Sequence, residues 1–260
     1  MIQNTLFSEE RSEEILKLIR ALGKVSVNTL SERFNVSSAT IRMDLTKLAK
    51  NGEIIRTHGG AMLAPSITSE RLISERENKD KKQLIAKEAI SLVENNDTLL
   101  LDTGTTMYFF AEEIANSKLQ GLSVFTNDFE IARILEKKGD VAVHLLGGTV
   151  RSGFHYCYGQ NVMLQLLKYN FDKLFIATSS INMEKGLTTQ HAETAILKSV
   201  MIRSANTKIL LTDSSKFDQL SFAQFASLNE IDILITDNHL SNERLKKLNK
   251  YISKIIITES

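Results

Sequence analysis

Apolar residues recur at helical spacing near the start of the chain, and this pattern predicts three helices. They cover 8–22, 26–34 and most of the stretch 36–52. Ser37 is placed to cap the third helix, because its hydroxyl can accept a hydrogen bond from an unpaired amide of the first turn. Gly52 follows the last turn, as a C-terminal cap would.

From Thr98 onward, short apolar runs alternate with helical stretches. Continuous apolar strands that alternate with helices are typical of a mainly parallel sheet covered on both faces. The strands predicted by these runs cover 98–101, 122–126, 141–146, 173–179, 208–212, 232–236 and 254–258.

The third helix near the start of the chain has two very different sides. Ile41, Leu45 and Leu48 form its apolar stripe. The opposite side and the flanks carry small, hydroxyl-bearing and cationic residues and one methionine, where a solvated helix would carry mixed charges: Ala39, Thr40, Arg42, Met43, Thr46 and Lys47. A surface of this kind suits a polyanionic partner.

An alternating stretch over 52–62 follows this helix and ends in a glycine pair, which predicts a two-stranded wing. Three helices and a hairpin, in that order, are typical of a winged helix-turn-helix, whose third helix enters the major groove of DNA. Between Arg33 and Met62 the sequence holds five basic residues, two acidic residues and His58, so positive charge is concentrated where phosphates would be met. A helical protein-interaction module is the alternative, and the wing favours DNA.

Composition narrows the class of protein. Apolar residues make up 42% and charged residues 24% of the 260 residues, and the formal net charge is +1, which argues against general coating of nucleic acid. The single cysteine, Cys157, excludes an internal disulfide and is expected to be a small buried side chain. Because no apolar run is long enough to span a bilayer and no secretory leader is seen, we expect a cytoplasmic protein with no membrane partner.

The only proline, Pro65, lies in a polar stretch that we predict to join two domains. The expected fold is α/β, with an N-terminal winged helix-turn-helix domain over 1–64, a linker over 65–78, and a mainly parallel α/β domain over 79–260. The segment after Pro65 is very charged and is predicted to be helical from about Lys79. We expect its charges to form a solvated face.

One turn of the second domain has the features of an anion-binding site. The stretch Leu99–Ala115 is predicted to form a strand, a glycine turn and a helix. Gly104 lets the backbone come close to a ligand, and the hydroxyls of Thr105 and Thr106 lie where the first amides of the helix point outward. A plain strand-to-helix turn with capping threonines explains the same residues, and spacing alone favours that alternative.

Three other turns follow predicted strands of the same sheet: 126–128, 146–153 and 212–217. Ligands of open α/β sheets gather at the carboxyl ends of strands, so these turns can converge on one site. Lys216 would supply a cation there, while Asp102 and Asn127 would hold hydroxyl groups. Ordinary roles fit them as well: a surface lysine, a turn former and a helix cap.

The stretch VSSATIRMDLTKLAKNGEIIRTHGGA resembles the N-terminal signature of DeoR-type bacterial transcription regulators. The matching residues are Thr40, Ile41, Arg42, Asp44, Leu45, Arg56, His58, Gly59, Gly60 and Ala61. Downstream of this stretch, the order and spacing of the motifs also agree with those of the family, so the resemblance covers nearly the whole chain. Together with the pattern of the helix, it implies DNA contacts from Ser37, Ser38, Ala39, Thr40, Arg42, Met43, Thr46, Lys47, Arg56 and His58.

One position departs from the family signature. Where the family usually has a second arginine, this chain has Met43. A methionine cannot donate to guanine, but it can lie against the methyl group of thymine. We therefore expect Met43 to alter which bases are preferred.

The resemblance implies that the second domain senses an effector, because its counterpart in the family is similar in fold to ribose-5-phosphate isomerase. In that fold the glycine–threonine loop holds a phosphate and a lysine approaches the sugar. The matching positions here are Asp102, Gly104, Thr105, Thr106, Thr126, Asn127, Gly147, Gly148, Glu193 and Lys216. Ser179 and Ser180 depart from the family pattern, which commonly has an aspartate and a glycine there.

These observations predict a DNA-binding transcription regulator, a repressor of a sugar operon that is controlled by a phosphorylated sugar and needs no cofactor or metal. A single small head buries too little surface for specific binding, so we expect a homo-oligomer on double-stranded operator DNA. The alternative is a sugar-phosphate isomerase that carries a DNA-binding head, with Glu193 as the base, although the isomerases' Asp-Gly-Ala-Asp loop is absent. A nucleotide-binding redox domain would need a Gly-x-Gly-x-x-Gly turn, which the sequence lacks.

Overall fold

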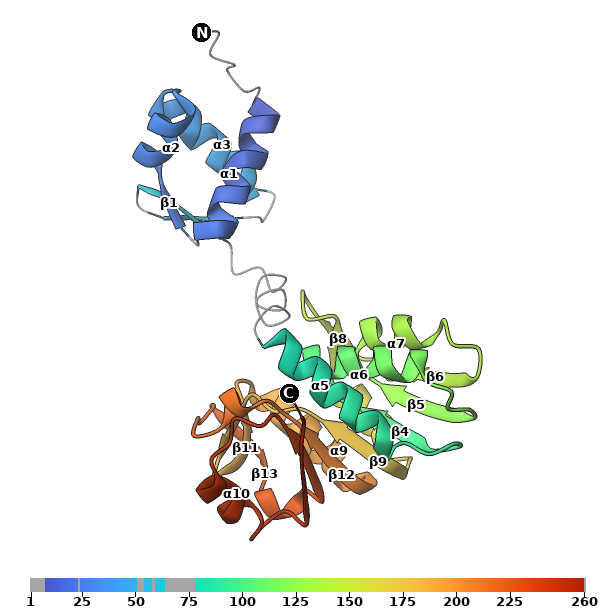
Figure 1. The fold of residues 1–260 in the computed structure, drawn as a ribbon. Helices are drawn as coiled ribbons and strands as arrows, with labels where there is room; N and C mark the ends of the chain where they lie inside the picture. Colours follow the sequence, from blue (N-terminus) through green and yellow to red (C-terminus); the bar gives the residue numbers. More distant parts are fainter. Residues whose placement is uncertain (1–7, 23, 51–53, 58, 64–77, 260) are drawn as a thin grey trace. The chain divides into compact units, whose positions relative to one another are not determined.

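The computed structural model describes residues 8–22, 24–50, 54–57, 59–63 and 78–259 (Figure 1). The chain forms two compact units, which divide between Ile73 and Ser74. Three sequence expectations lie outside the described residues: the cap Gly52, the DNA contact His58 and the linker residues 65–77. The predicted domain bounds therefore stay predictions.

The first unit contains three helices and a small antiparallel sheet. Its elements in chain order are α1 (Ser8–Leu22), β1 (Lys24–Ser26), α2 (Val27–Phe34), α3 (Ser38–Lys50), β2 (Ile54–Thr57) and β3 (Gly60–Leu63). The strands lie in the order β1-β3-β2, so β3 pairs with both of the others. The predicted helices and wing are thus confirmed, and β1, a strand of three residues that the pattern does not predict, extends the wing.

Local hydrogen bonds fix where the helices of the first unit begin. The Ser26 hydroxyl accepts a hydrogen bond from the Thr29 amide at 3.0 Å, and the Ser37 hydroxyl accepts one from the Thr40 amide at 3.1 Å, which confirms Ser37 as the cap of α3. Asn35 ends α2 in the left-handed conformation, with φ of 51°, which asparagine tolerates better than most residues. The turn between α2 and α3 is therefore short, as a helix-turn-helix requires.

The apolar core of the first unit encloses a buried ion pair. The side chains at the centre of this core are at most 1% exposed: Ile15, Ile19, Leu30, Ile41 and Leu45. Beside them, Arg11 Nε donates to Asp44 Oδ2 at 2.7 Å. Asp44 belongs to the sequence motif of α3, and this contact gives it a structural role, because a buried carboxylate needs a partner of opposite charge.

The second unit is built on a seven-stranded sheet in the order β15-β14-β12-β9-β4-β5-β6, in which all neighbouring strands are parallel. The strands are β4 (Thr98–Leu101), β5 (Leu122–Thr126), β6 (Val141–Leu145), β9 (Phe171–Ile176), β12 (Ala205–Leu211), β14 (Ile233–Thr236) and β15 (Lys254–Ile257). Each of them overlaps one of the predicted apolar runs. The predicted α/β fold class, with a mainly parallel sheet after a winged helix-turn-helix, is confirmed.

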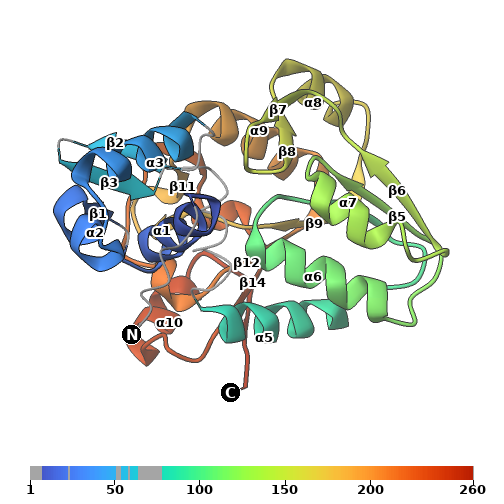
Figure 2. The ribbon, with the colours of Figure 1, turned by 90° about the horizontal axis from the view of Figure 1, so that it is seen from above.

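Helices cover both faces of the sheet. One face is covered by α5 (Lys79–Ala89), α6 (Thr105–Asn116) and α7 (Phe129–Leu135), and the other by α8 (Gln160–Leu166), α9 (Ala192–Arg203) and α10 (Asn242–Leu248). Both views show α5 and α6 side by side (Figures 1 and 2). Side chains of β4 alternate between the two cores, with Leu99 and Leu101 on the α6 side and Leu100 on the α9 side.

Two small antiparallel sheets lie outside what the apolar pattern predicts. They pair β7 (Thr149–Arg151) with β8 (Tyr156–Tyr158), and join β10 (Ser180–Asn182), β11 (Gly186–Thr189) and β13 (Ala223–Ala226). Strands of three or four residues are too short to show an alternating pattern. The remaining elements are the 3₁₀ helices η1 (Ile90–Leu92), η2 (Ser214–Lys216) and η3 (Leu228–Glu230). Within the described ranges, no helix has the length and apolar character needed to cross a membrane.

Asp44→Ala is expected to destabilise the first unit by about 3–5 kcal/mol, because the buried Arg11 guanidinium loses its carboxylate. Calorimetry of the full chain should show a lower unfolding temperature for that unit. The double variant Arg11→Met, Asp44→Leu should recover most of the loss, since it replaces both charges by apolar groups. As a control, Glu14→Gln breaks the exposed pair with Lys17 and should leave unfolding unchanged. If Asp44→Ala unfolds at the same temperature as the wild type, the structural role of Asp44 is contradicted.

Candidate functional site

The exposed side of α3 gathers most of the residues predicted to contact DNA. Its exposed side chains include Ala39, Arg42, Met43, Thr46 and Lys47. The apolar stripe of the helix is buried in the core of the first unit. Met43 is 74% exposed, so its thioether is accessible to an apolar group such as the methyl group of thymine.

A hydrogen-bonded link joins α3 to the wing. The Thr46 hydroxyl donates to the Arg42 carbonyl at 2.6 Å and accepts a hydrogen bond from Arg56 Nη1, in β2, at 2.8 Å. The side chain of Thr46 is therefore occupied on both sides, and it positions Arg56 beside the exposed side of α3. This is a positioning role that the sequence pattern did not reveal for Thr46.

The start of α3 and its charges complete the candidate DNA surface. The hydroxyls of Ser37 and Thr40 share a hydrogen bond of 2.9 Å, and Ser38 is half-buried beside them. Arg42, Lys47 and Arg56 are all exposed, whereas the one acidic residue of α3 turns inward to its arginine partner. The surface that remains is cationic and hydroxyl-bearing, as contact with phosphates and base edges requires.

In the second unit, the order of strands places a topological switch point between β4 and β9. The chain proceeds from β4 outward to β5 and β6, and then returns to β9 on the other side of β4. Ligands of open α/β sheets bind in the crevice at the carboxyl ends of such strands. Asp102 follows β4 and Ala177 follows β9, so both residues lie at this point of the sheet.

A buried lysine occupies the switch point. Lys198, from α9, is 5% exposed, and its ammonium pairs with Asp102 Oδ2 and donates to the Ala177 carbonyl at 2.9 Å. The Ala177 amide donates to the same Asp102 oxygen at 3.0 Å. Lys198 and Ala177 thus both engage Oδ2 of Asp102, and the expectation that Asp102 holds effector hydroxyl groups stays a prediction.

Sequence reasoning missed Lys198. Its signal in the sequence is a single lysine inside the apolar run Ala195–Met201, where a buried charge requires a partner. The identity of that partner depends on how α9 packs against the strand ends.

The turn after β4 keeps the geometry predicted for an anion site. Gly104 has φ of 118°, a conformation that favours glycine, and a Cβ added there would meet no atom within 4 Å. A ligand can therefore approach this stretch of backbone closely. α6 begins immediately afterwards, so Thr105 and Thr106 lie in its first turn, whose amides have no acceptor within the helix.

At the end of β5 and directly after it, most polar groups have partners within the chain, and one is left for a ligand. The Thr126 hydroxyl accepts a hydrogen bond from the Asp128 amide at 3.1 Å, which gives Thr126 a turn-forming role. Asn127 Nδ2 donates to the Cys157 carbonyl at 2.7 Å. Asn127 Oδ1 is buried and has no hydrogen-bond partner among the described residues, so it remains an acceptor for a ligand donor. Cys157 is buried, as expected.

The two glycines of the turn after β6 have different reasons to be glycine. A Cβ on Gly148 would lie 2.6 Å from the Tyr158 carbonyl oxygen, so the packing of β7 on β8 explains this residue. Gly147 has open space around it, and its carbonyl accepts a hydrogen bond from Gln165 at 2.8 Å. Gly147 is thus the one of the two that a ligand can approach.

Glu193 and Lys216 lie at the periphery of the switch point. Glu193 is in the first turn of α9 and is exposed, and Lys216 ends η2 and is half-buried. Within the described part of the chain, neither side chain forms a hydrogen bond or ion pair with Asp102 or Lys198. The structure therefore places Glu193 on the helix that carries Lys198 and Lys216 on the turn after β12, and neither joins the buried pair.

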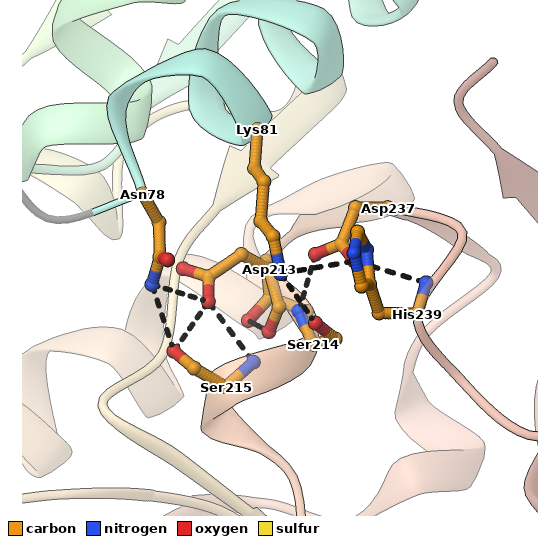
Figure 3. A network of polar contacts seen from close by, with 8 residues as sticks. Asn78, Lys81, Asp213, Ser214, Ser215, Asp237 and His239 are labelled. Atoms are coloured by element: carbon orange, nitrogen blue, oxygen red, sulfur yellow. Dashed lines mark hydrogen bonds and ion pairs between the residues drawn. The ribbon is translucent and has the colours of Figure 1, made fainter. Parts of the chain in front are cut away.

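A second polar cluster attaches the start of α5 to the carboxyl ends of β12 and β14 (Figure 3). We call it the α5 clasp, and it consists of Asn78, Lys81, Asp213, Ser214, Ser215, Asp237 and His239. Lys81 Nζ lies 3.4 Å from Asp237 Oδ1 and donates to the Ser214 hydroxyl at 3.1 Å. Asn78 Nδ2 donates to Asp213 Oδ1 at 3.3 Å. The clasp thus holds α5 against the same η2 turn that carries Lys216.

Asp237 is the anionic centre of the α5 clasp. Burial alone would raise the pKa of its carboxyl, but hydrogen bonds from Ser214 and His239 and the charge of Lys81 outweigh burial and lower that pKa. The Ser214 amide donates to Oδ2 at 2.7 Å, and His239 Nδ1 lies 2.8 Å from Oδ1.

The charges at the start of α5 are not all on a solvated face, and that expectation is wrong for two of them. Lys82 is 4% exposed, and Lys81 is drawn into the α5 clasp. The reason is that α5 packs against α6, β12 and β14, so Lys81 meets the polar residues that follow β12 and β14.

A winged helix-turn-helix joined to a parallel α/β domain with a polar strand edge defines a class of protein: transcription regulators that couple DNA binding to a separate sensing domain. Residues 11–66 match the model of the DeoR-like helix-turn-helix domain, and residues 77–238 match that of the DeoR C terminal sensor domain. The chain belongs to the DeoR family of DNA-binding transcription regulators.

Relatives across nearly the whole length are named as regulators rather than enzymes. The chain is 34% identical to the HTH-type transcriptional repressor GlcR of Bacillus subtilis, over 98% of each chain. It is 36% identical to the lactose phosphotransferase system repressor of Streptococcus mutans, over 94% of this chain and 97% of the relative. It is 32% identical to a putative aga operon transcriptional repressor of Escherichia coli O157:H7, over 96% of this chain and 94% of the relative. The chain is therefore assigned as a regulator and not as an isomerase.

Solved structures give partial likenesses. Ribose 5-phosphate isomerase A from Methanocaldococcus jannaschii aligns with a TM-score of 0.41 and 20% identity over 54% of this chain and 55% of that one. eIF2B delta from Chaetomium thermophilum aligns with a TM-score of 0.43 and 15% identity over 96% of this chain and 70% of that one.

Asp237→Asn is expected to loosen the start of α5 at pH 7, because the carboxylate that attracts Lys81 is lost. Hydrogen exchange of the Lys82 amide, which donates to the Asn78 carbonyl at 3.0 Å where α5 begins, and of the helix amides after it should become faster in this variant. Glu243→Gln is the matched control, since it breaks an exposed carboxylate–lysine pair with Lys247 elsewhere and should change nothing in α5.

The pH dependence of hydrogen exchange at these amides follows from the direction in which the pKa of Asp237 is shifted. The pKa of Asp237 in the folded protein is below its ordinary value of 3.8. The stability that the Asp237 carboxylate gives to the α5 clasp is therefore complete above pH 3.8 and is lost as the pH falls through the folded pKa. The difference between wild type and Asp237→Asn should therefore persist at pH 5. Equal exchange in both proteins at pH 7 would show that the clasp does not hold α5.

Proposed function

We propose that the protein is a cytoplasmic repressor of a sugar-metabolism operon, which binds double-stranded operator DNA as a homo-oligomer and is released by a phosphorylated sugar. The exposed, cationic side of α3 beside the wing is the observation that carries the DNA-binding part. The relatives named as repressors of the lactose phosphotransferase system and of the aga operon support a sugar-related target.

On DNA, α3 would enter the major groove with its exposed side toward the bases. Arg42 can donate to base edges or phosphates, and Lys47 and Arg56 can meet the backbone on either side. Met43 can make an apolar contact with thymine. Because one small head has too few contacts for specificity in a genome, two heads related by symmetry would read two half-sites.

In the sensor domain, a phosphate group would bind at the start of α6. Gly104, Thr105 and Thr106 supply a close backbone approach and first-turn amides, which favour an anion. The unpartnered Asn127 Oδ1 would accept a hydrogen bond from a sugar hydroxyl. Lys216 would add a cation from η2, and Asp102 would act through Lys198 by holding the strand ends in place.

The α5 clasp supports a route from the sensor site to the DNA-binding head. An effector can shift DNA affinity only through its different affinity for two states of the protein. A ligand drawn to Lys216 would pull on η2, and η2 contacts α5 through Ser214 and Ser215. α5 is the first described element of the sensor domain, directly after the segment that leads from the head.

Arg42 and Met43 are expected to have different effects on DNA binding. Arg42→Ala should weaken operator binding by about 1–3 kcal/mol, through loss of a base or phosphate contact. Met43→Arg should instead change the ranking of operator sequences, since it restores a donor that can read guanine. Selection from a random DNA library, with wild type and both variants, measures each effect. An identical consensus for wild type and Met43→Arg would rule out a reading role for residue 43.

Lys216→Ala should leave operator binding nearly unchanged and abolish its response to a phosphorylated sugar. Fluorescence anisotropy of labelled operator, titrated with a panel of sugar phosphates and the free sugars, measures both quantities. The control is Lys254→Ala, which removes an exposed lysine at the amino end of β15, away from the carboxyl edge. A wild-type response from Lys216→Ala would place the effector elsewhere. Turnover of a sugar phosphate, removed by Glu193→Gln, would instead support the isomerase alternative.

A further inference from the structure

Arg151 is a half-buried cation that has no acidic partner among the residues that the structure describes. It ends β7, and its Nη1 donates to the Tyr156 hydroxyl at 3.0 Å. The guanidinium carbon lies 4.5 Å from the ring centre of Phe154 and 5.8 Å from that of Tyr156, so aromatic faces hold the group in place. In the part of the chain that the structure describes, no carboxylate lies within ion-pair distance of it. Of its five N–H donors, the structure assigns one to Tyr156.

The contacts of Arg151 lead back to the switch point of the sheet. The Tyr156 hydroxyl lies 3.5 Å from the Thr194 hydroxyl, on α9. Thr194 and Lys198 are four residues apart on that helix and so lie on one face of it. Lys198 pairs with Asp102. Arg151 and Tyr156 are thus linked to the face of α9 that also carries Lys198, whose partners Asp102 and Ala177 follow β4 and β9.

The electrostatics of Tyr156 agree with this placement. Burial raises the pKa of the Tyr156 phenol, the hydrogen bond with Thr194 and the charge of Arg151 lower it in part, and the charge of Asp102 raises it again. Tyr156 thus lies within the field of both Arg151 and Asp102. Its β8 strand also pairs with the turn after β5, because the Cys157 amide donates to the Asn127 carbonyl at 2.8 Å.

We infer that Arg151 is an anion-binding residue of the sensor site, which receives an anionic group of the effector. The inference rests on the proposed function, because it assigns a second point of contact to the same effector. The planar guanidinium is held by the hydroxyl of Tyr156 and by the rings of Phe154 and Tyr156. It therefore keeps its orientation without a carboxylate that an incoming anion would have to displace. It can therefore offer two parallel donors to a phosphate or carboxylate group.

The first test asks whether Arg151 binds an anion at all. In the full chain labelled with ¹⁵N, the Arg151 side-chain resonance is identified by its loss in Arg151→Gln, and the protein is titrated with inorganic phosphate. We expect this resonance to shift along a saturable curve. The exposed Arg203, at the end of α9, is the internal control and should shift weakly and without saturation. Equal, non-saturating shifts at both arginines would overturn the inference.

The second test measures the effector response. In the operator-release assay with a panel of sugar phosphates, Arg151→Gln should raise the concentration needed for half release by at least about tenfold, the cost of one charge-assisted hydrogen bond. Arg203→Gln should not change it. If a sugar phosphate releases operator equally well from wild type and Arg151→Gln, the inference fails and the proposed function stands. If no sugar phosphate releases operator while phosphate saturates Arg151, the proposed function fails and the anion site stands.

A purely structural role for Arg151 is separated by thermal unfolding. Arg151→Gln with a lower unfolding temperature but an unchanged effector response would show that the arginine only supports the hairpin, and would overturn the inference. Tyr156→Phe removes the hydroxyl that orients Arg151 and keeps the cation. We expect it to weaken the effector response by less than Arg151→Gln does.

Discussion

The buried pair of Lys198 and Asp102 is the interaction on which the sensor domain depends. It lies where the order of strands reverses, between β4 and β9, and it draws α9 onto the ends of both strands. A charge buried this deeply is stable only with its partner, so the pair fixes one arrangement of the crevice. The turn at Gly104, where we propose that a phosphate binds, directly follows Asp102 in the chain, and Thr194, which leads toward Arg151, lies one helical turn before Lys198 on α9.

The DNA-binding head is also ordered by a buried ion pair, that of Arg11 and Asp44. Asp44, the only acidic residue of α3, is turned inward to Arg11, so the exposed side of the helix is not weakened by a negative charge. The link from Thr46 to Arg56 then fixes the wing beside that side. In both units, a buried ion pair joins elements that are far apart in the chain.

The sequence predicts the frame of both units because that frame depends on long apolar patterns. Seven apolar runs are enough to identify the strands of the parallel sheet, and one glycine–threonine turn is enough to mark the start of α6. The buried position of Lys198 could not be predicted from the sequence, because its partner Asp102 is 96 residues away in the chain. Arg151 contacts near neighbours in the chain, but its strand β7 and the paired strand β8 are too short to be recognised from an apolar pattern. Lys81 was misjudged for the same reason as Lys198, since its partner Asp237 is more than 150 residues away.

Under the proposed function, the carboxyl edge of the sensor sheet and the operator-binding head share one equilibrium. Thermodynamic reciprocity tests it most directly. The affinity of the full chain for the sugar phosphate that releases operator should be measured by calorimetry in the absence and in the presence of saturating operator DNA. The account predicts that operator weakens sugar-phosphate binding by the same factor by which the sugar phosphate weakens operator binding. Equal sugar-phosphate affinity in both measurements would contradict it.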